Sequence, residues 1–169
     1  MNGTILPTTK VLHEIKLFQV FSEQDLLPLI ENGEAKTYEA YVNIIIEGEQ
    51  SWGLYLILDG TVGIFKSNAL SGNTYDVGQL GKGSFFGEMS LVDENPRSAT
   101  VRALTDCQLF YISKEVFSVF LDHSDGQKLR FYETCVKTLV SRLRELDDNY
   151  VTSQYLLWKT ALLKEKEAA

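Results

Sequence analysis

The sequence predicts a mainly β fold, a small barrel or sandwich, with short helices before the strands and one long helix after them. Three observations support this prediction. Short runs rich in β-branched and aromatic residues follow one another from residue 36 to residue 112, separated by turns of glycine and polar residues. Residues 10–33 instead carry apolar side chains at helical spacing. From residue 127 onward, the chain has no proline or glycine and keeps a helical apolar period.

Composition bounds the class of protein. The chain has 169 residues, of which 44% are hydrophobic and 23% are charged, and this fits one globular domain with an appendage. The formal net charge is −7. Residues 1–127 hold 8 basic and 17 acidic residues, whereas residues 128–169 hold 8 and 6. Neither part has the clustered lysine and arginine that neutralise nucleic-acid phosphates, so we expect no direct DNA binding.

Two helices are expected before the strands. Residues 10–18 place apolar side chains at helical spacing. Ser22 and Asp25 then form a capping-box variant that begins a second helix, and Gly33 ends it.

The strand region is expected to contain a hairpin. The apolar run 54–58 stops at Asp59-Gly60, a strong two-residue turn signal, and residues 61–66 read as its antiparallel partner. A polar loop at 67–74 follows this unit. The other expected strands are 36–38, 43–46, 75–80, 99–103 and 107–112. Ser113 then begins a helix with an apolar stripe.

Residues 85–101 carry most of the chemical information, and they read as an anion site. Gly81, Gly83 and Gly87 leave room for the backbone to approach a ligand closely. Residues 88–91 can form one helical turn, whose first N–H groups have no intrahelical partner and suit a phosphate. Arg97 follows a proline-containing turn and can give two parallel hydrogen bonds to phosphate oxygens.

Glu88 is the unusual member of this group. A carboxylate beside a phosphate is electrostatically unfavourable unless it accepts hydrogen bonds from hydroxyl groups, and a ribose 2′-OH is the obvious donor.

The run Gly87-Glu88-Met89-Ser90-Leu91, followed after five residues by Arg97-Ser98-Ala99-Thr100-Val101, resembles the phosphate-binding cassette of cyclic nucleotide-binding domains. The resemblance covers roughly residues 17–120. It implies a double-stranded, jelly-roll-like β-roll that occupies residues 10–126 with its flanking helices. It also implies that Glu88 binds the ribose 2′-OH, that Arg97 pairs with the cyclic phosphate, and that Ser98 lies near phosphate and purine. The expected ligand-binding residues are Phe86, Gly87, Glu88, Met89, Ser90, Arg97, Ser98 and Ala99.

The resemblance favours cAMP over cGMP, although the Ser98 hydroxyl is compatible with either purine. An alternative remains open, because a salt bridge between Glu88 and Arg97 at a strand turn would place the same two charges. In that case a β-roll without ligand would serve as a dimerisation or docking module.

The expected long helix spans residues 127–166. Its apolar positions alternate in steps of three and four and define a seam, which comprises Leu129, Tyr132, Val136, Leu139, Leu143, Leu146, Tyr150, Ser153 and Leu157. A narrow seam favours a parallel homodimer over a helix that folds back on its own domain.

In the family that the cassette resembles, the helix at this position covers the nucleotide and joins two protomers. By position along the helix, the candidates for covering the purine are Leu143, Leu146, Asp147 and Tyr150. The residues that hydrogen-bond adenine in catabolite activator protein are not evident at these positions. We therefore expect a sensor that transmits ligand occupancy through this helix to a protein partner that the sequence does not identify.

Other functions find little support. The chain has two histidines, His13 and His123, both outside the expected strands, so we expect no enzyme and no metal. Only about 20 residues follow Asp148, too few for a helix-turn-helix module. No secretory signal or transmembrane stretch is evident, and Cys107 and Cys135 lack paired spacing. We therefore expect a cytoplasmic protein that is not bound to a membrane.

Overall fold

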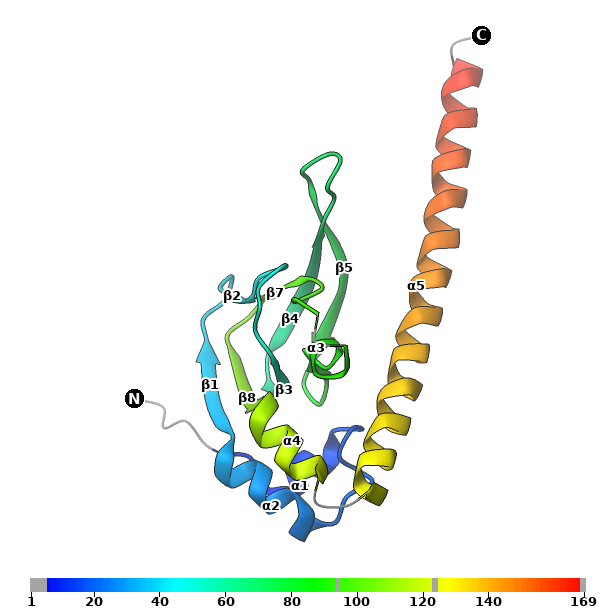
Figure 1. The fold of residues 1–169 in the computed structure, drawn as a ribbon. Helices are drawn as coiled ribbons and strands as arrows, with labels where there is room; N and C mark the ends of the chain where they lie inside the picture. Colours follow the sequence, from blue (N-terminus) through cyan, green and yellow to red (C-terminus); the bar gives the residue numbers. More distant parts are fainter. Residues whose placement is uncertain (1–5, 94, 123–124, 168–169) are drawn as a thin grey trace. The chain divides into compact units, whose positions relative to one another are not determined.

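The computed structural model describes residues 6–93, 95–122 and 125–167, with side chains as far as residue 160. The chain forms two compact units, the first ending at Phe131 and the second beginning at Tyr132. Figure 1 shows the order of the elements along the chain.

The first unit contains two four-stranded antiparallel sheets. One has the order β1-β8-β3-β6 and the other β2-β7-β4-β5. The strands are β1 (Glu34–Tyr38), β2 (Asn43–Ile45), β3 (Gly53–Asp59), β4 (Thr61–Ser67), β5 (Thr74–Gly81), β6 (Phe85–Phe86), β7 (Thr100–Ala103) and β8 (Cys107–Ser113). The helices of this unit are α1 (Thr9–Glu14), α2 (Glu23–Asn32), α3 (Met89–Val92) and α4 (Lys114–Asp122), and helix α5 (Asp125–Glu167) starts in it. The predicted mainly β fold with flanking helices is confirmed.

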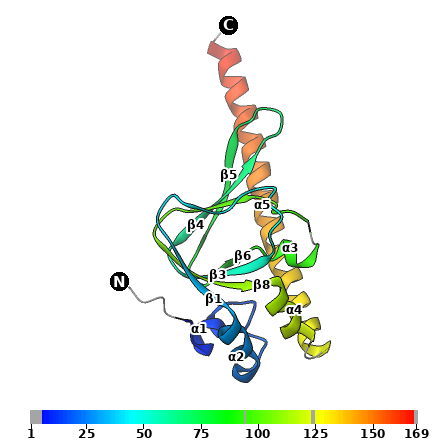
Figure 2. The ribbon, with the colours of Figure 1, turned by 60° about the vertical axis from the view of Figure 1, so that its left-hand side comes forward.

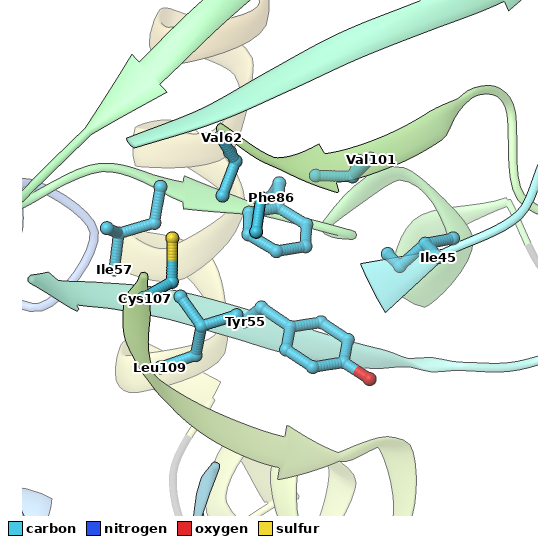
Figure 3. Close-up of a cluster of buried hydrophobic side chains, with 9 residues drawn as sticks. Ile45, Tyr55, Ile57, Val62, Phe86, Val101, Cys107 and Leu109 are labelled. Carbon is cyan, nitrogen blue, oxygen red and sulfur yellow. The ribbon is translucent and has the colours of Figure 1, made fainter. Parts of the chain in front are cut away.

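The core lies between the two sheets. Strands β3, β6 and β8 contribute side chains from one sheet, and β2, β4 and β7 contribute them from the other (Figure 3). Its buried members are Ile45, Tyr55, Ile57, Val62, Phe86, Val101, Ala103, Cys107 and Leu109. Because side chains alternate along a strand, Leu54 and Leu56 point to the other face of β3, and they are also fully buried. Strand β3 is therefore covered on both faces.

Helices α1, α2 and α4 lie on the outer face of the sheet that contains β3 (Figure 2). The Phe21 and Phe120 rings pack edge to face at 5.0 Å. A Cβ on Gly33 would lie 2.2 Å from the Phe110 ring, so this residue has no room for a side chain where α2 ends. The helical layer thus completes a second apolar cluster.

The predicted helix starts are confirmed at α2 and α4. Ser22 and Asp25 form the capping box, with both reciprocal bonds present. The Val116 N–H donates to Ser113 Oγ at 3.3 Å. The expected helix over residues 10–18 is wrong in extent, because α1 ends at Glu14 and short turns follow.

The hairpin predicted through Asp59-Gly60 is wrong. Strand β3 pairs with β6 and β8, whereas β4 pairs with β5 and β7 in the other sheet. Gly60 has φ +90°, and a Cβ there would lie 2.4 Å from the Asp106 carbonyl oxygen. The Asp-Gly turn is therefore a corner at which the chain crosses between sheets, and β4 finds its hairpin partner in β5.

Replacing Gly60 with alanine is expected to destabilise the fold by about 2–3 kcal/mol, because the new Cβ meets backbone and the positive φ disfavours L side chains. Urea unfolding followed by circular dichroism measures this change. The matched control is Gly72→Ala, since Gly72 also has positive φ but no atom lies within 4 Å of its Cβ position. Equal losses in the two variants would contradict the corner interpretation.

The second unit consists of the continuation of α5. This helix has 43 residues in all, and its length is about 65 Å at about 1.5 Å per residue. Most of its predicted seam is solvent-exposed, with exposed fractions of 56% for Leu143, 54% for Leu146 and 65% for Leu157, whereas Leu139 is half-buried. Among the described residues, no helix has the length and apolar character needed to cross a membrane.

Candidate functional site

Arg97 is the centre of the site that the structure forms. It precedes β7, and only 5% of its surface is exposed. Its Nε donates to Ser51 Oγ at 3.0 Å. Its Nη1 donates to the Gly53 carbonyl at 3.1 Å, the Gly87 carbonyl at 3.2 Å and Ser90 Oγ at 2.9 Å. The guanidinium is thus fixed along one edge by the segment that leads into β3 and by the residues around α3.

The positive charge of Arg97 has no ion-pair partner among the described residues, since none of their carboxylate oxygens lies within 4.0 Å of it. Within the same residues, Nη2 makes no hydrogen bond. Burial lowers the pKa of Arg97, and nearby acidic side chains act in the opposite direction. A buried cation without an ion pair is costly unless an anion joins it. The alternative of a Glu88–Arg97 salt bridge does not describe this arrangement.

Gly87 lets the guanidinium approach the backbone. Its φ is +87°, and a Cβ would lie 2.7 Å from Arg97 Nη1 and 2.6 Å from the Gly53 carbonyl oxygen. No atom lies within 4 Å of the Cβ position of Gly81 or Gly83, so no neighbouring protein atom excludes a side chain there, and the expectation that these two glycines leave room for a ligand stays a prediction. The Gly83 N–H donates to the Ile57 carbonyl at 2.9 Å, which places Gly83 in the turn before β6.

Two buried polar residues flank Gly87 and Arg97. Glu88 is 2% exposed and Ser90 is 4% exposed. The Ser90 hydroxyl donates to the Gly87 carbonyl at 3.1 Å while it accepts from Arg97. Glu88 directly precedes α3 and makes no capping hydrogen bond with its side chain. The predicted helical turn is therefore present, one residue later than expected.

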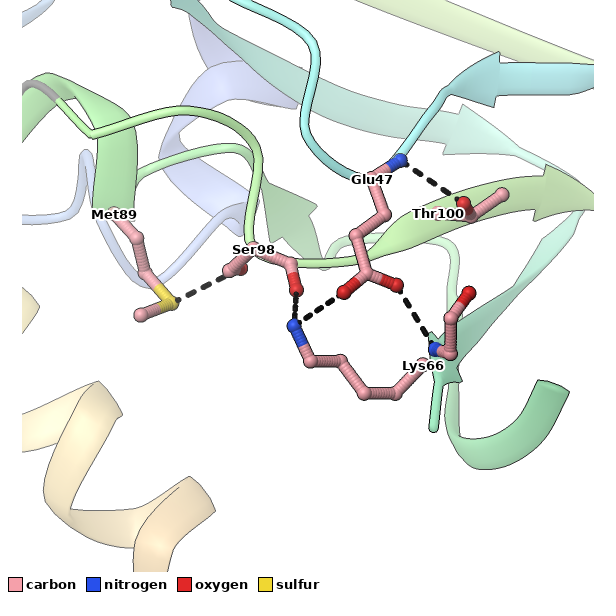
Figure 4. Close-up of polar contacts among 6 residues, drawn as sticks. Glu47, Lys66, Met89, Ser98 and Thr100 are labelled. Carbon is pink, nitrogen blue, oxygen red and sulfur yellow. Dashed lines mark hydrogen bonds and ion pairs between the residues drawn. The ribbon is translucent and has the colours of Figure 1, made fainter. Parts of the chain in front are cut away.

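The other predicted site residues take different places. The Phe86 ring is buried in the core and stacks on Tyr55 at 5.0 Å, so it supports the site from the interior. Met89 is 44% exposed, and its sulfur accepts a hydrogen bond from the exposed Ser98 hydroxyl at 3.6 Å (Figure 4). Ala99 is half-buried and directly precedes β7.

The sequence interpretation missed the segment that holds Arg97. Ser51 and Gly53 lie more than 40 residues before it and belong to no recognisable motif. It also missed Tyr55. Burial is the main cause that raises the pKa of Tyr55, and the interaction of this side chain with Arg97 raises the pKa of Arg97. Of these residues, Gly53 is the one whose residue type points to the site. A Cβ at this position would overlap the Tyr111 ring, and the Gly53 carbonyl accepts a hydrogen bond from Arg97.

The four candidates for covering the purine, Leu143, Leu146, Asp147 and Tyr150, lie on α5 in the second unit, and all four are exposed. Their role toward a ligand stays a prediction.

The two-sheet roll and the buried arginine beside a glycine turn define a class of nucleotide-binding regulatory domain. The chain belongs to the cyclic nucleotide-binding domain family, whose model matches residues 35–124, just over half of the chain. Over 135 residues it is 27% identical to a cAMP-dependent protein kinase regulatory subunit of Colletotrichum orbiculare. That match covers 80% of this chain and 34% of that protein.

Two solved structures are similar. A cyclic nucleotide-binding domain from Methylobacillus flagellatus superposes with a TM-score of 0.74 and 25% identity, covering 86% of this chain and 82% of that chain. The regulatory domain of Toxoplasma gondii PKA, co-crystallised with cAMP, superposes with a TM-score of 0.63 and 29% identity, covering 67% and 42%. The chain spans only about a third of the length of the kinase regulatory subunit, since the match covers 34% of it.

Proposed function

We propose that this chain binds a cyclic nucleotide at Arg97 and acts as a regulatory sensor. The observation that carries the proposal is the buried guanidinium, which is fixed through Nε and Nη1 and leaves Nη2 without a partner among the described residues. A cyclic phosphate supplies the missing negative charge and the acceptor oxygens, and charge-assisted hydrogen bonds of this kind are the strong ones.

Glu88 supports a nucleotide over a simple phosphate ion. Its carboxyl group is buried directly beside the phosphate-binding residues, where it would repel a bare anion. A ribose hydroxyl removes the conflict, because it donates a hydrogen bond to the carboxylate. The same chemistry explains why we expect free inorganic phosphate to bind weakly.

We favour cAMP over cGMP. The matched kinase regulatory subunit is named for cAMP, and the similar Toxoplasma regulatory domain was crystallised with it. Isothermal titration calorimetry with cAMP, cGMP and inorganic phosphate tests both the class of ligand and the preference. We expect binding of both cyclic nucleotides, tighter for cAMP, and only weak binding of phosphate. No binding of either nucleotide at high micromolar concentration would leave the alternative of a β-roll that only dimerises or docks.

We further propose that α5 joins two copies of the chain through its seam and carries the signal of occupancy to a protein partner. The seam presents large apolar side chains to solvent along several turns of helix, a face that a second helix covers in a parallel coiled coil. We assign the chain no catalytic role of its own and place it in the cytoplasm.

Replacing Leu146 with glutamate is expected to convert a dimer into a monomer, because it puts charge at a central seam position. Sedimentation equilibrium of the full chain measures the mass. The control is Val151→Glu, which adds the same charge outside the seam, at a position that is 66% exposed against 54% for Leu146. A monomeric wild type, or a Leu146→Glu variant that still dimerises, would refute the proposed interface.

A further inference from the structure

A charged bridge crosses from β4 to the cassette at Ser98. The Lys66 ammonium, at the end of β4, donates to the Ser98 carbonyl and lies 2.6 Å from Glu47 Oε1 (Figure 4). The second carboxylate oxygen of Glu47 accepts from the Ser67 N–H at 2.9 Å. Lys66 and Glu47 thus orient each other, and the ammonium is held on the backbone one residue after Arg97.

The main chain at Glu47 is joined to the same segment. The Glu47 N–H donates to Thr100 Oγ1 at 3.0 Å. The Gly48 N–H donates to the Arg97 carbonyl at 2.9 Å, and the Arg97 N–H donates to the Glu49 carbonyl at 2.9 Å. Residues 47–49 and 97–100 therefore run side by side, and Lys66 joins the two segments through Glu47 and the Ser98 carbonyl.

This arrangement fixes the direction of two hydrogen-bond donors. In a trans peptide, the C=O and the following N–H point in opposite directions, and no cis peptide occurs among the described residues. Lys66 holds the Ser98 carbonyl, so the Ala99 N–H points away from Lys66. Gly48 holds the Arg97 carbonyl, so the Ser98 N–H points away from Gly48. Neither N–H has an acceptor among the described residues.

We propose that Lys66 and Glu47 are positioning residues of the anion site, which act by holding the backbone around Ser98 in the orientation that its ligand needs. This inference rests on the proposed binding of a cyclic nucleotide at Arg97. It adds a pair of residues from outside the cassette, Lys66 and Glu47, which lie 21 and 40 positions before Gly87 in the chain and contact the backbone and each other.

The sign of the Glu47 effect separates positioning from simple charge attraction. If only the electric field mattered, Glu47→Gln would strengthen binding of an anion, because it removes a negative charge near the site. If the bridge positions the backbone, the same substitution weakens binding. Lys66→Met weakens binding in either case, so it cannot make this distinction alone.

The experiment is calorimetric titration of cAMP into the full chain and its variants. Lys66→Met and Glu47→Gln are each expected to weaken binding by roughly 5- to 20-fold, the scale of one charge-assisted hydrogen bond. Lys66→Arg is expected to restore most of the affinity, because a guanidinium also donates to both partners. The double variant is expected to lose about as much as either single one, since both remove the same bridge.

Two controls change charge without touching the bridge. Lys82→Met removes a lysine for which the described residues offer no ion pair or hydrogen bond. Glu34→Gln removes the carboxylate of a second ion pair, in which Glu34 Oε2 lies 3.2 Å from Lys36 Nζ. Both are expected to bind cAMP within about twofold of wild type. Unchanged or tighter binding by Glu47→Gln, with wild type binding normally, would overturn the inference alone.

If the wild-type chain binds no nucleotide, the proposed function is refuted, but the role of the bridge can still be tested by a measurement without ligand. Hydrogen exchange of the Arg97 and Gly48 amides, which bond across the two segments, is expected to be faster in Lys66→Met and Glu47→Gln than in wild type and the controls. Equal exchange in all five proteins would show that the bridge does not hold this backbone.

Discussion

Arg97→Ala is expected to weaken cyclic nucleotide binding by at least about 100-fold. Two charge-assisted hydrogen bonds to phosphate are together worth about 3 kcal/mol or more, and each 1.4 kcal/mol or so is a factor of about ten in affinity. The loss should be larger than for Lys66→Met or Glu47→Gln, because Arg97 Nη2 has no hydrogen-bond partner among the described residues, whereas the Lys66 ammonium is already held by the Ser98 carbonyl and Glu47. Calorimetric titration with cAMP measures it.

The truncation also removes the donor that four groups share, namely Ser51 Oγ, the Gly53 and Gly87 carbonyls and Ser90 Oγ. Arg97→Lys separates the loss of binding from damage to the fold, since it keeps the charge but not the planar pair of donors. We expect roughly a tenfold loss for it.

The matched control for both variants is Arg102→Ala on β7. The Arg102 guanidinium lies 5.2 Å from the Phe65 ring centroid, and its Nε donates to Asn43 Oδ1 at 2.8 Å. Its removal should leave the affinity within about threefold of wild type. A folded Arg97→Ala protein with wild-type affinity would rule out Arg97 as the phosphate contact.

Gly87→Ala is expected to lower the free energy of unfolding by about 2–4 kcal/mol and to abolish measurable nucleotide binding. Its Cβ would lie 2.7 Å from Arg97 Nη1 and 2.6 Å from the Gly53 carbonyl oxygen. The carbonyl oxygen belongs to the backbone of β3 and cannot give way easily, so the guanidinium must move out of its position. Urea unfolding measures the stability, and titration at a temperature where the variant is folded measures the binding.

Gly83→Ala isolates the cost of the backbone conformation. Gly83 has φ +82°, close to that of Gly87, yet no atom lies within 4 Å of its Cβ position. It should lose only about 1 kcal/mol of stability and retain binding. Similar effects of the two substitutions would show that the contact with Arg97 is not what requires glycine at position 87.

The cassette could be predicted from the sequence because its main parts are close together in the chain. Gly87, Glu88 and Arg97 lie within eleven residues, and local rules for turns and helix starts apply to them directly. The Glu88 and Arg97 side chains are buried. The helix starts at Ser22 and Ser113 were predictable for the same reason.

The rest depended on topology, which local patterns do not encode. The Asp59-Gly60 pair has the composition of a hairpin turn, but the strands on its two sides belong to different sheets. Strand β3 pairs with β8 and strand β4 pairs with β5, and both partners follow later in the chain, so the pairing depends on distant residues. Ser51, Glu47 and Lys66 reach the cassette only because the roll brings their segments alongside it, so no short-range rule identifies them.

The hairpin of β4 and β5 has a practical consequence for building a biosensor. Its connection closes on itself, with the Asn68 N–H donating to the Asn73 carbonyl at 2.8 Å and the Gly72 N–H to the Asn68 carbonyl at 2.9 Å. Leu70 at its tip is 99% exposed, so a fluorescent reporter inserted after it would leave the core untouched. The reporter would lie in the connection that follows Ser67, the last residue of β4, so a change at the bridge of Lys66 and Glu47 would reach it through only a few residues.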